Sequence, residues 1–323
     1  MIRKALLVAG FAVLVAIPLM VDGFQVALVT RGLVWATLAL SVWFLLRILS
    51  LPSFGHAAFF GVAAYAAGLS VTRWGIDNVF VALALSIALT CLVALPIALV
   101  AGRLGSISFL LVTLAFAEML HSLSLRWREV GGSDGLVGVT RPDAWPLPLD
   151  LSEPVGYFYF ALGVLAVCAL VLVVVVRSPF GGVLVGIRES EARMSALGYN
   201  PVAYRVAAFV LSAAVAGAAG VVHAYLNRFV NPEDLGALVS ARGLLIVVIA
   251  GTSVWAPVLV AVVLTVGEDA LSTHTDRWLA VVGVVYILVA LFAHAPVRMG
   301  DLWARLRGRR RPIGTPVTLE EDT

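Results

Sequence analysis

An acidic and a basic side chain lie three residues apart within a long apolar run. The run LVTLAFAEMLHSL contains Glu118 and His121, which a helix would place on one face. A carboxylate in hydrocarbon is costly, so such residues generally face a bundle interior or an aqueous path, where they relay protons or contact a solute. The sequence therefore predicts either a pathway or gating role for the two residues, or a structural hydrogen bond between them.

The glycine-rich stretch at residues 126–153 carries a pattern that is shared with hydrolases. Gly131-Gly132-Ser133-Asp134-Gly135 fits G-x-S-x-G, in which a sharp strand-to-helix turn presents a nucleophilic serine. That geometry needs a sheet and partnering histidine and acidic residues, and this sequence predicts no sheet. We therefore interpret these five residues as a structural turn or a docking loop.

Neither metal binding nor ATP hydrolysis is predicted for this chain. No histidine has a metal-ligand spacing such as HExxH. The histidines lie at positions 56, 121, 223, 274 and 294. Cys91 and Cys168 lie inside apolar runs without neighbouring ligands. Lys4 is the only lysine, so no lysine is available for a phosphate-binding P-loop. We expect no cofactor on this chain, and any ATP and magnesium should be held by another chain.

The composition indicates what positions these residues. Of the 323 residues, 61% are hydrophobic and 13% are charged, and the mean hydropathy is +1.02, which is outside the range of soluble domains. We expect an all-α integral membrane protein with about ten transmembrane helices. The apolar runs lie near residues 5–21, 26–49, 54–72, 79–101, 105–125, 155–176, 206–227, 239–254, 257–271 and 278–294. Residues 1–300 should form the membrane domain, followed by a basic and then acidic tail at 301–323.

The basic residues predict the orientation, because cytoplasmic loops carry an excess of lysine and arginine. With both termini in the cytoplasm, 14 of the 22 basic residues fall on cytoplasmic segments. This orientation places the polar interval 177–205 inside and the 126–153 loop outside. The tail has five arginines between Arg305 and Arg311, which suit anionic lipid headgroups better than nucleic acid.

Small residues recur every three or four positions in two of the runs. Such a stripe lets another helix approach closely in lipid, where packing drives association. The glycines concerned are Gly55, Gly61, Gly68, Gly217 and Gly220. His56 lies in the first of these runs and is a further candidate for the pathway.

The polar interval 177–205 is predicted to contain a short helix between two breakers. We expect the helix to run from about Val183 to Leu197 and to end in a left-handed turn at Gly198. The breakers around it are Ser178-Pro179, Gly181-Gly182 and Asn200-Pro201. By its charge pattern alone the helix is either a solvated connector between two spans or a knob that another protein grips.

The sequence GIRESEARMSALGYNPVAYRVAAFVLSAAVAGAAG resembles the cytoplasmic coupling segment and following helix of permease subunits from the branched-chain amino-acid ABC importers, the LivM type. In that family the segment docks into a groove on the ATPase subunit. The residues that match the family pattern are Arg188, Glu189, Glu191, Ala196, Leu197 and Gly198. The resemblance implies that this segment passes ATP-driven movement to the membrane helices.

Three further motifs carry the same resemblance. Gly55 to Gly61 matches the third-helix signature, the TLAFAE run that holds Glu118 has a family counterpart, and GGSDGL at 131–136 resembles the external loop that faces the solute-binding protein. The chain departs from the family in IAGTSVWAPVL, where Ala250, Ser253 and Ala256 replace expected glycines. This departure puts the local helix break in doubt.

The resemblance implies a permease that pairs with a second, related permease, two ATPase subunits and a solute-binding protein within a lipid bilayer. The solute would be a branched-chain amino acid, or urea or a short amide as in close relatives. An alternative of another class is a proton-coupled secondary transporter that uses Glu118.

Overall fold

The computed structural model describes residues 20–251 and 253–274, together with isolated positions 15, 16, 18, 277, 280, 281, 283 and 284. Within these residues the regular structure is helical and contains no β-strand. The α-helices are α2 (Gly23–Leu49), α3 (His56–Thr72), α4 (Val79–Ala101), α5 (Ser106–Arg126), α6 (Pro154–Arg177), α7 (Pro179–Glu189), α8 (Glu191–Ala196), α9 (Pro201–Asn227), α10 (Ala237–Ala250) and α11 (Ala256–Ser272). Short 3₁₀ helices are η2 (Arg128–Val130), η3 (Gly132–Asp134) and η4 (Pro232–Leu235).

Five of these helices are long and apolar enough to cross a membrane, namely α2, α4, α5, α6 and α9. The helices α3 and α10 are apolar but shorter. Eight of the predicted apolar runs coincide with helices. The runs at 5–21 and 278–294 lie outside the described residues apart from a few positions, and the tail at 301–323 lies entirely outside them. An all-helical membrane protein is confirmed, while the count of ten helices and the side of the termini stay predictions.

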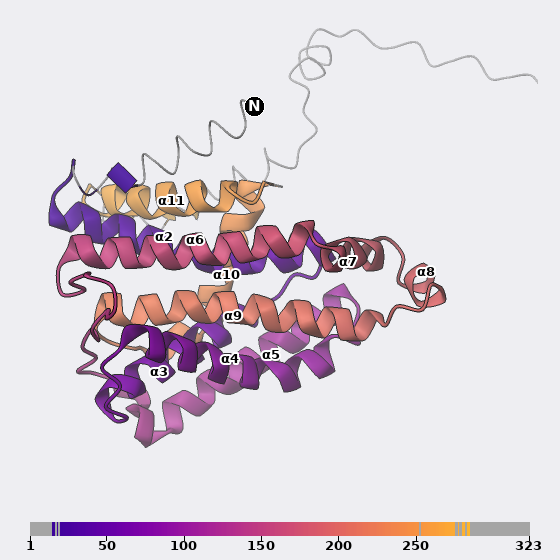
Figure 1. Cartoon of the computed structure of the whole chain (residues 1–323), viewed down its shortest axis with the longest axis horizontal. Helices are drawn as coiled ribbons and strands as arrows, with labels where there is room; N and C mark the ends of the chain where they lie inside the picture. The colour runs from indigo at the N-terminus through magenta and orange to yellow at the C-terminus, as the bar shows by residue number, and fades with distance from the viewer. Residues whose placement is uncertain are drawn as a thin grey trace, which may run out of the picture.

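The centre of the bundle is formed by α2 and α9, which pack against each other. In Figure 1, α6 runs in front of α2 and is seen alongside α9. Helices α6 and α11 pack against α2, and α3 and α4 pack against α9. In the most apolar stretch of α2, 89% of the residues are buried, which explains why this helix is hydrophobic on every side. By contrast, only 17% of the residues in the corresponding stretch of α5 are buried. Most of the apolar surface of α5 therefore faces away from this chain.

The chain enters α3 through an extended segment that returns into the bundle. Its backbone groups bond to side-chain hydroxyls: Phe54 N–H donates to Thr113 Oγ1 at 3.2 Å, and Ala57 N–H donates to Ser240 Oγ at 2.8 Å. Ser240 in turn donates to the Phe54 carbonyl at 2.6 Å. Buried non-helical backbone needs such partners because no water or helical bond satisfies it.

A break separates α10 from α11, at the place where the sequence departs from the family pattern. Gly251 has φ +78°, a conformation that favours glycine, and Pro257 lies in the first turn of α11. The loss of the flanking glycines therefore leaves the helix break in place.

The helix predicted over 183–197 is wrong in its boundaries, because two helices occupy this interval. Ser178 and Pro179 end α6 and begin α7 at once, and Gly181, which was expected to stop the span, lies inside α7 with its Cα close to the Val176 carbonyl. Ser190 then interrupts the helix, since its side chain accepts from Arg193 N–H and caps α8. Such a cap competes with continuation of the helix.

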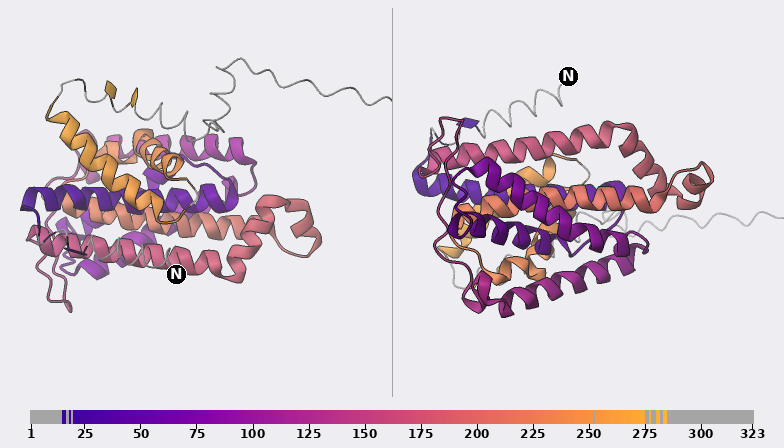
Figure 2. Two further views of the ribbon diagram at one scale, coloured as in Figure 1. Left: turned by 90° about the horizontal axis from the view of Figure 1, so that it is seen from above. Right: turned by 60° about the horizontal axis from the view of Figure 1, so that its bottom comes forward.

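The predicted end of this interval is confirmed. Gly198 has φ +89°, in the left-handed region. Asn200 caps α9 by accepting from Ala203 N–H at 3.2 Å, and Pro201 takes the first helical position. Figure 2 shows that α7 and α8 project beyond one end of the bundle. We call residues 177–205 the elbow.

Candidate functional site

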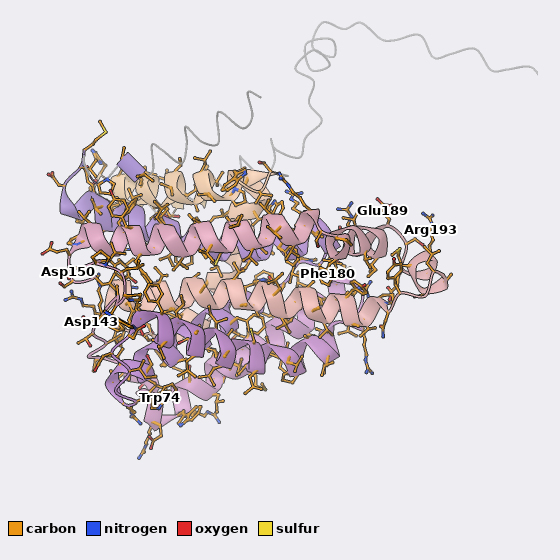
Figure 3. The ribbon with its side chains drawn as sticks, in the orientation of Figure 1. Trp74, Asp143, Asp150, Phe180, Glu189 and Arg193 are labelled. Atoms are coloured by element: carbon orange, nitrogen blue, oxygen red, sulfur yellow. The ribbon has the colours of Figure 1, made fainter. Side chains whose placement is uncertain are left out.

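The base of the elbow is packed against the bundle, and its tip is exposed. Leu184 and Ile187 of α7 are buried against the bundle, where α7 contacts α2, α6 and α9. None of the six residues of α8 is buried. Figure 3 shows Glu189 and Arg193 at the projecting end, away from the membrane helices. The elbow therefore presents a small polar projection on a base that is packed against the spans.

Two arginines tie the base of the elbow to other helices. Arg188 Nη1 donates to the Arg47 carbonyl at the end of α2, at 2.7 Å. The Arg47 guanidinium in turn lies 3.5 Å from the Val247 carbonyl of α10. The last carbonyls of a helix have no intrahelical donor and attract cations. These contacts connect α7 to α2, and α2 to α10.

The tip is held to α9 and to α7 by separate contacts. Glu191 forms an ion pair with Arg205 of α9 at 2.7 Å. Met194 packs onto Gly186 of α7, where a Cβ would lie 2.7 Å from the sulfur. The angle between α7 and α8 is therefore fixed by packing rather than left to a flexible linker.

The six residues that the sequence singled out in the elbow separate into two groups. Arg188 and Glu191 reach back to the bundle through the bonds just described. The others are exposed at the tip, and they are Glu189, Ala196, Leu197 and Gly198. Leu197 is 67% exposed, although it is apolar. The first group suits attachment to this chain, and the second suits contact with another one.

Towards the opposite end, titratable residues from α5, α9 and η4 form a group that we call the polar cluster: Glu118, His121, His223, Glu233 and Asp234. His121 lies between two carboxylates, with Nδ1 3.7 Å from Glu118 Oε2 and Nε2 3.6 Å from Glu233 Oε1. His223 Nε2 lies 3.2 Å from Asp234 Oδ1, and both side chains are mostly buried. The sequence predicted that Glu118 and His121 share a face, which the structure confirms.

The polar cluster is positioned by η4, which inserts beside α3 and α5. Asn231 and Asp234 form a capping box that fixes the short helix. Leu235 packs onto Gly61, where a side chain would overlap it. The predicted packing glycine Gly61 thus admits the segment that carries Glu233 and Asp234.

The other predicted packing glycines also lie at close contacts. At Gly220 an added Cβ would overlap the Phe60 carbonyl, and at Gly68 it would come within 2.5 Å of Leu136. At Gly217 it would meet Thr90 at 3.2 Å, and at Gly55 it would meet Thr113 at 3.2 Å. These positions bring α3, α4, α5, α9 and the 126–153 loop together.

An aromatic platform adjoins the polar cluster. Phe60 lies 4.9 Å from the His223 ring and stacks with Trp35 at 6.1 Å between ring centroids. The Arg242 guanidinium lies over Trp35 at 4.2 Å and forms an ion pair with Glu268 at 2.5 Å. Arg242 was not among the residues predicted from the sequence, although an arginine inside an apolar run is itself a signal of function.

His56, the third pathway candidate, lies elsewhere. It is completely buried, and its Nε2 is 2.9 Å from Ser212 Oγ. Because Ser212 donates its only proton to the Ser41 carbonyl at 2.7 Å, it accepts from His56, which fixes Nε2–H as the protonated position. His56 therefore belongs to the core between α2, α3 and α9.

The 126–153 loop is ordered by specific bonds. Gly131 and Gly135 have φ +98° and +72°, and they flank Gly132, Ser133 and Asp134 of η3. Leu136 pairs with Val230 through two backbone hydrogen bonds. Arg141 donates to the Tyr225 and Leu151 carbonyls at 2.9 and 2.7 Å, and burial lowers the pKa of Arg141. The loop thus covers the end of α9 as a rigid surface.

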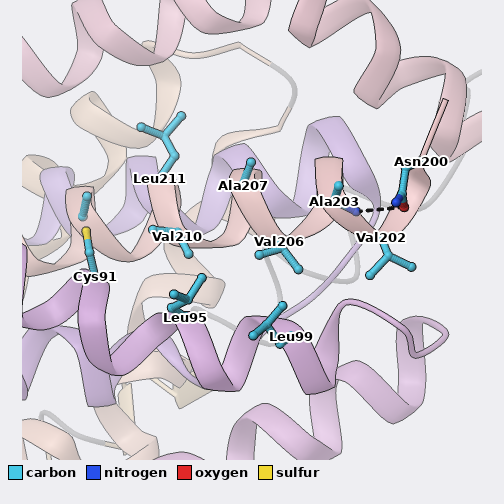
Figure 4. A pocket seen from close by; sticks show the side chains of 11 residues that line it. Cys91, Leu95, Leu99, Asn200, Val202, Ala203, Val206, Ala207, Val210 and Leu211 are labelled. Carbon is cyan, nitrogen blue, oxygen red and sulfur yellow. Dashed lines mark hydrogen bonds between the residues drawn. The ribbon is translucent and has the colours of Figure 1, made fainter.

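An apolar groove runs between α4 and α9 near the elbow (Figure 4). Leu95 and Leu99 of α4 face Val206 and Val210 of α9 across it. Asn200 is at its margin, where its side chain is engaged in capping α9. This lining suits hydrocarbon and offers little to a polar solute.

Comparisons with known proteins agree with these features. Residues 25–292 match the family model described as "Branched-chain amino acid transport system / permease component". The chain is similar to the high-affinity branched-chain amino acid transport system permease protein LivM of Salmonella typhimurium, with 26% identity over 90% of this chain and 73% of the relative. LivM of Escherichia coli is 27% identical over the same shares.

No solved structure matches the chain. The family model covers most of the sequence and includes all ten described α-helices except the first two residues of α2. The chain therefore belongs to the family of branched-chain amino acid transport system permease components.

Proposed function

We propose that this chain is one membrane subunit of an ATP-driven importer that carries branched-chain amino acids across a bacterial plasma membrane. The observation that supports the proposal most is the elbow, in which α7 is packed on three helices and α8 projects without a buried residue. A projection of this kind offers a soluble partner a rigid grip. Its end of the bundle would then face the cytoplasm.

The proposed partners are two ATPase subunits, a second related permease and an external solute-binding protein. The tip residues Glu189, Leu197 and Gly198 would enter a groove on one ATPase subunit. The exposed surface of α5, which carries Glu118, would face the second permease, since a membrane helix that is 17% buried has an open face for another subunit. The loop around Ser133 and Asp134 would meet the binding protein.

The helices α2 and α10 each have contacts in both the elbow and the surroundings of the polar cluster, which suggests how movement would be transmitted. The helix α2 carries Arg47 at the elbow and Trp35 beside the polar cluster, and α10 carries Val247 and Arg242 in the same way. Closure of the ATPase subunits would displace α7 together with α2 and α10. The path beside Glu118 and His121 would then open alternately to the two sides.

Purification of the chain from its native membrane in a mild detergent tests this proposal. We expect a second permease-like chain and two ATP-binding chains to accompany it, as identified by mass spectrometry. After reconstitution, uptake of leucine should require ATP inside the vesicle and should persist when a protonophore collapses the proton gradient.

The proximity of Glu118 and His121 also favours a second candidate, a proton-coupled secondary transporter. In that case the chain would purify alone and uptake would fail when the proton gradient collapses. The protonophore measurement therefore separates the two candidates directly.

A further inference from the structure

The carboxylates of the polar cluster have more hydrogen-bonding capacity than the described residues use. Glu118 and Glu233 are 49% and 68% exposed, and each lies more than 3.5 Å from a ring nitrogen of His121. These separations exceed a normal hydrogen bond. The arrangement leaves both carboxylates accessible to a donor that the described residues do not supply.

His121 cannot satisfy both acids at once when it is neutral. A neutral imidazole carries one N–H group and one lone pair, so one of the two carboxylates faces a lone pair. The Nε2 atom, on the side of Glu233, is buried and has no hydrogen-bond partner within the part of the chain that the structure describes. A cation with several N–H donors would satisfy Glu118, Glu233 and this nitrogen together.

Within the residues that the structure describes, buried donors on the inner side of the polar cluster also lack an acceptor of good geometry. Tyr65 of α3 is 6% exposed, and its hydroxyl lies near Ser124 and Asp234 without a well-aligned hydrogen bond to either. Trp35 is 8% exposed, its Nε1 is unpaired, and its ring lies 6.3 Å from that of His223. Unpaired donors of this kind are unfavourable in a core unless a ligand reaches them.

The surrounding charges favour a cation over an anion. Besides Glu118 and Glu233 the polar cluster contains Asp234, and the nearby arginine, Arg242, is already paired with Glu268. A metal ion fits the arrangement poorly, because the described residues contain no group of three or more ligands placed to hold one. An ammonium group is compact, carries three donors and prefers carboxylate oxygens.

We propose that Glu118 and Glu233, held on either side of His121, bind the ammonium group of the transported amino acid as it passes this chain. The proposal rests on the proposed import function and specifies its solute class. A neutral urea or amide offers no positive charge to these carboxylates, so the polar cluster would select amino acids over such solutes. Tyr65 and Trp35 would face the part of the solute that accepts hydrogen bonds.

The test uses the full complex reconstituted in vesicles with the loaded solute-binding protein, and the variants Glu118→Gln, Glu233→Gln and the double variant. Loss of one charge-assisted hydrogen bond should lower leucine uptake about tenfold in each single variant, and the double variant should lose more. ATP hydrolysis stimulated by the loaded binding protein should stay near the wild-type rate. Asp77→Asn, an exposed acid in the connection between α3 and α4, is the matched control and should transport normally.

A second measurement separates this proposal from the import function. Equilibrium binding of radiolabelled leucine to the purified complex, in competition with unlabelled isovaleramide, needs no ATP. We expect leucine to bind wild type, isovaleramide to compete weakly, and the double variant to lose leucine binding, while Glu118→Asp retains part of it. Normal leucine binding and uptake by a correctly assembled double variant would overturn the ammonium site, whereas uptake by wild type that does not need ATP would overturn the import proposal alone.

Discussion

The elbow and the polar cluster are built in opposite ways. The elbow is one continuous stretch of chain whose base is attached through side chains that bond to helix-end carbonyls, as Arg188 does at Arg47. The polar cluster combines α5, α9 and η4, and close packing at Gly61 holds it together. The elbow can therefore move as a unit with the helices it touches, whereas the polar cluster changes shape whenever those helices shift. This difference suits transmission of movement at the elbow and opening and closing of a path at the polar cluster.

A substitution at Gly220 should disrupt both regions together and have the largest effect. An added Cβ would overlap the Phe60 carbonyl, where α9 and α3 approach most closely. We expect Gly220→Ala to destabilise the protein by about 3 kcal/mol or more, because overpacking here moves backbone rather than a flexible side chain. Thermal unfolding in detergent measures the loss.

Gly163→Ala is the matched control for this substitution. Gly163 also lies within a membrane helix, α6, but no described residue lies within 4 Å of the position of its added Cβ. It should leave the unfolding temperature unchanged or raise it. Equal destabilisation by both substitutions would contradict the close-packing explanation.

Removal of Arg242 should disturb the polar cluster and leave the elbow intact. Arg242→Ala takes away the cation from Glu268 and from the face of Trp35, which should cost about 3 kcal/mol because a largely buried carboxylate loses its ion pair with this arginine. The double variant Arg242→Gln and Glu268→Gln should recover part of the stability. A stability loss in the double variant as large as in Arg242→Ala would argue against the ion pair as the cause.

A substitution at Gly198 should disturb the elbow and leave the polar cluster intact, and it should have the smallest effect on stability. Valine at φ +89° strains the turn by about 1–2 kcal/mol, at a site where no described residue lies within 4 Å of the added Cβ. On the proposed function, Gly198→Val should weaken association with the ATPase subunits and leave membrane insertion intact. Unchanged solute-stimulated ATP hydrolysis in this variant would count against the elbow as the docking site.

The sequence was most informative where structure depends on neighbouring residues. Apolar runs located the helices. Gly198 with Asn200-Pro201 located the turn between α8 and α9, because left-handed turns and caps are local preferences. The break at Ser190 also had a local signal, since Ser190 is followed by Glu191 in the first turn of a new helix. The helical spacing of the apolar residues on both sides of Ser190 favoured a single helix and outweighed this signal.

Contacts between distant residues could not be read in the same way. The spacing of Glu118 and His121 indicated one helical face, but the approach of His121 to Glu233 depends on how η4 inserts beside α3. Likewise the bond from Arg188 to Arg47 and the pair of Arg242 with Glu268 join segments that only the packed bundle brings together. The glycine at position 61 marked close packing without showing that Leu235 would fill the space.

The ratio of ATP hydrolysed to leucine imported by an Arg188→Ala complex tests most directly whether the elbow drives the rest of the chain. Without the bond to the Arg47 carbonyl, α7 should move without pulling α2, so hydrolysis should continue while uptake falls about tenfold. Arg193→Ala, at the exposed tip, is the control and should leave this ratio unchanged, and Arg188→Lys should restore part of the uptake. A wild-type ratio in Arg188→Ala would contradict the account, because the elbow would then be coupled to the helices without this bond.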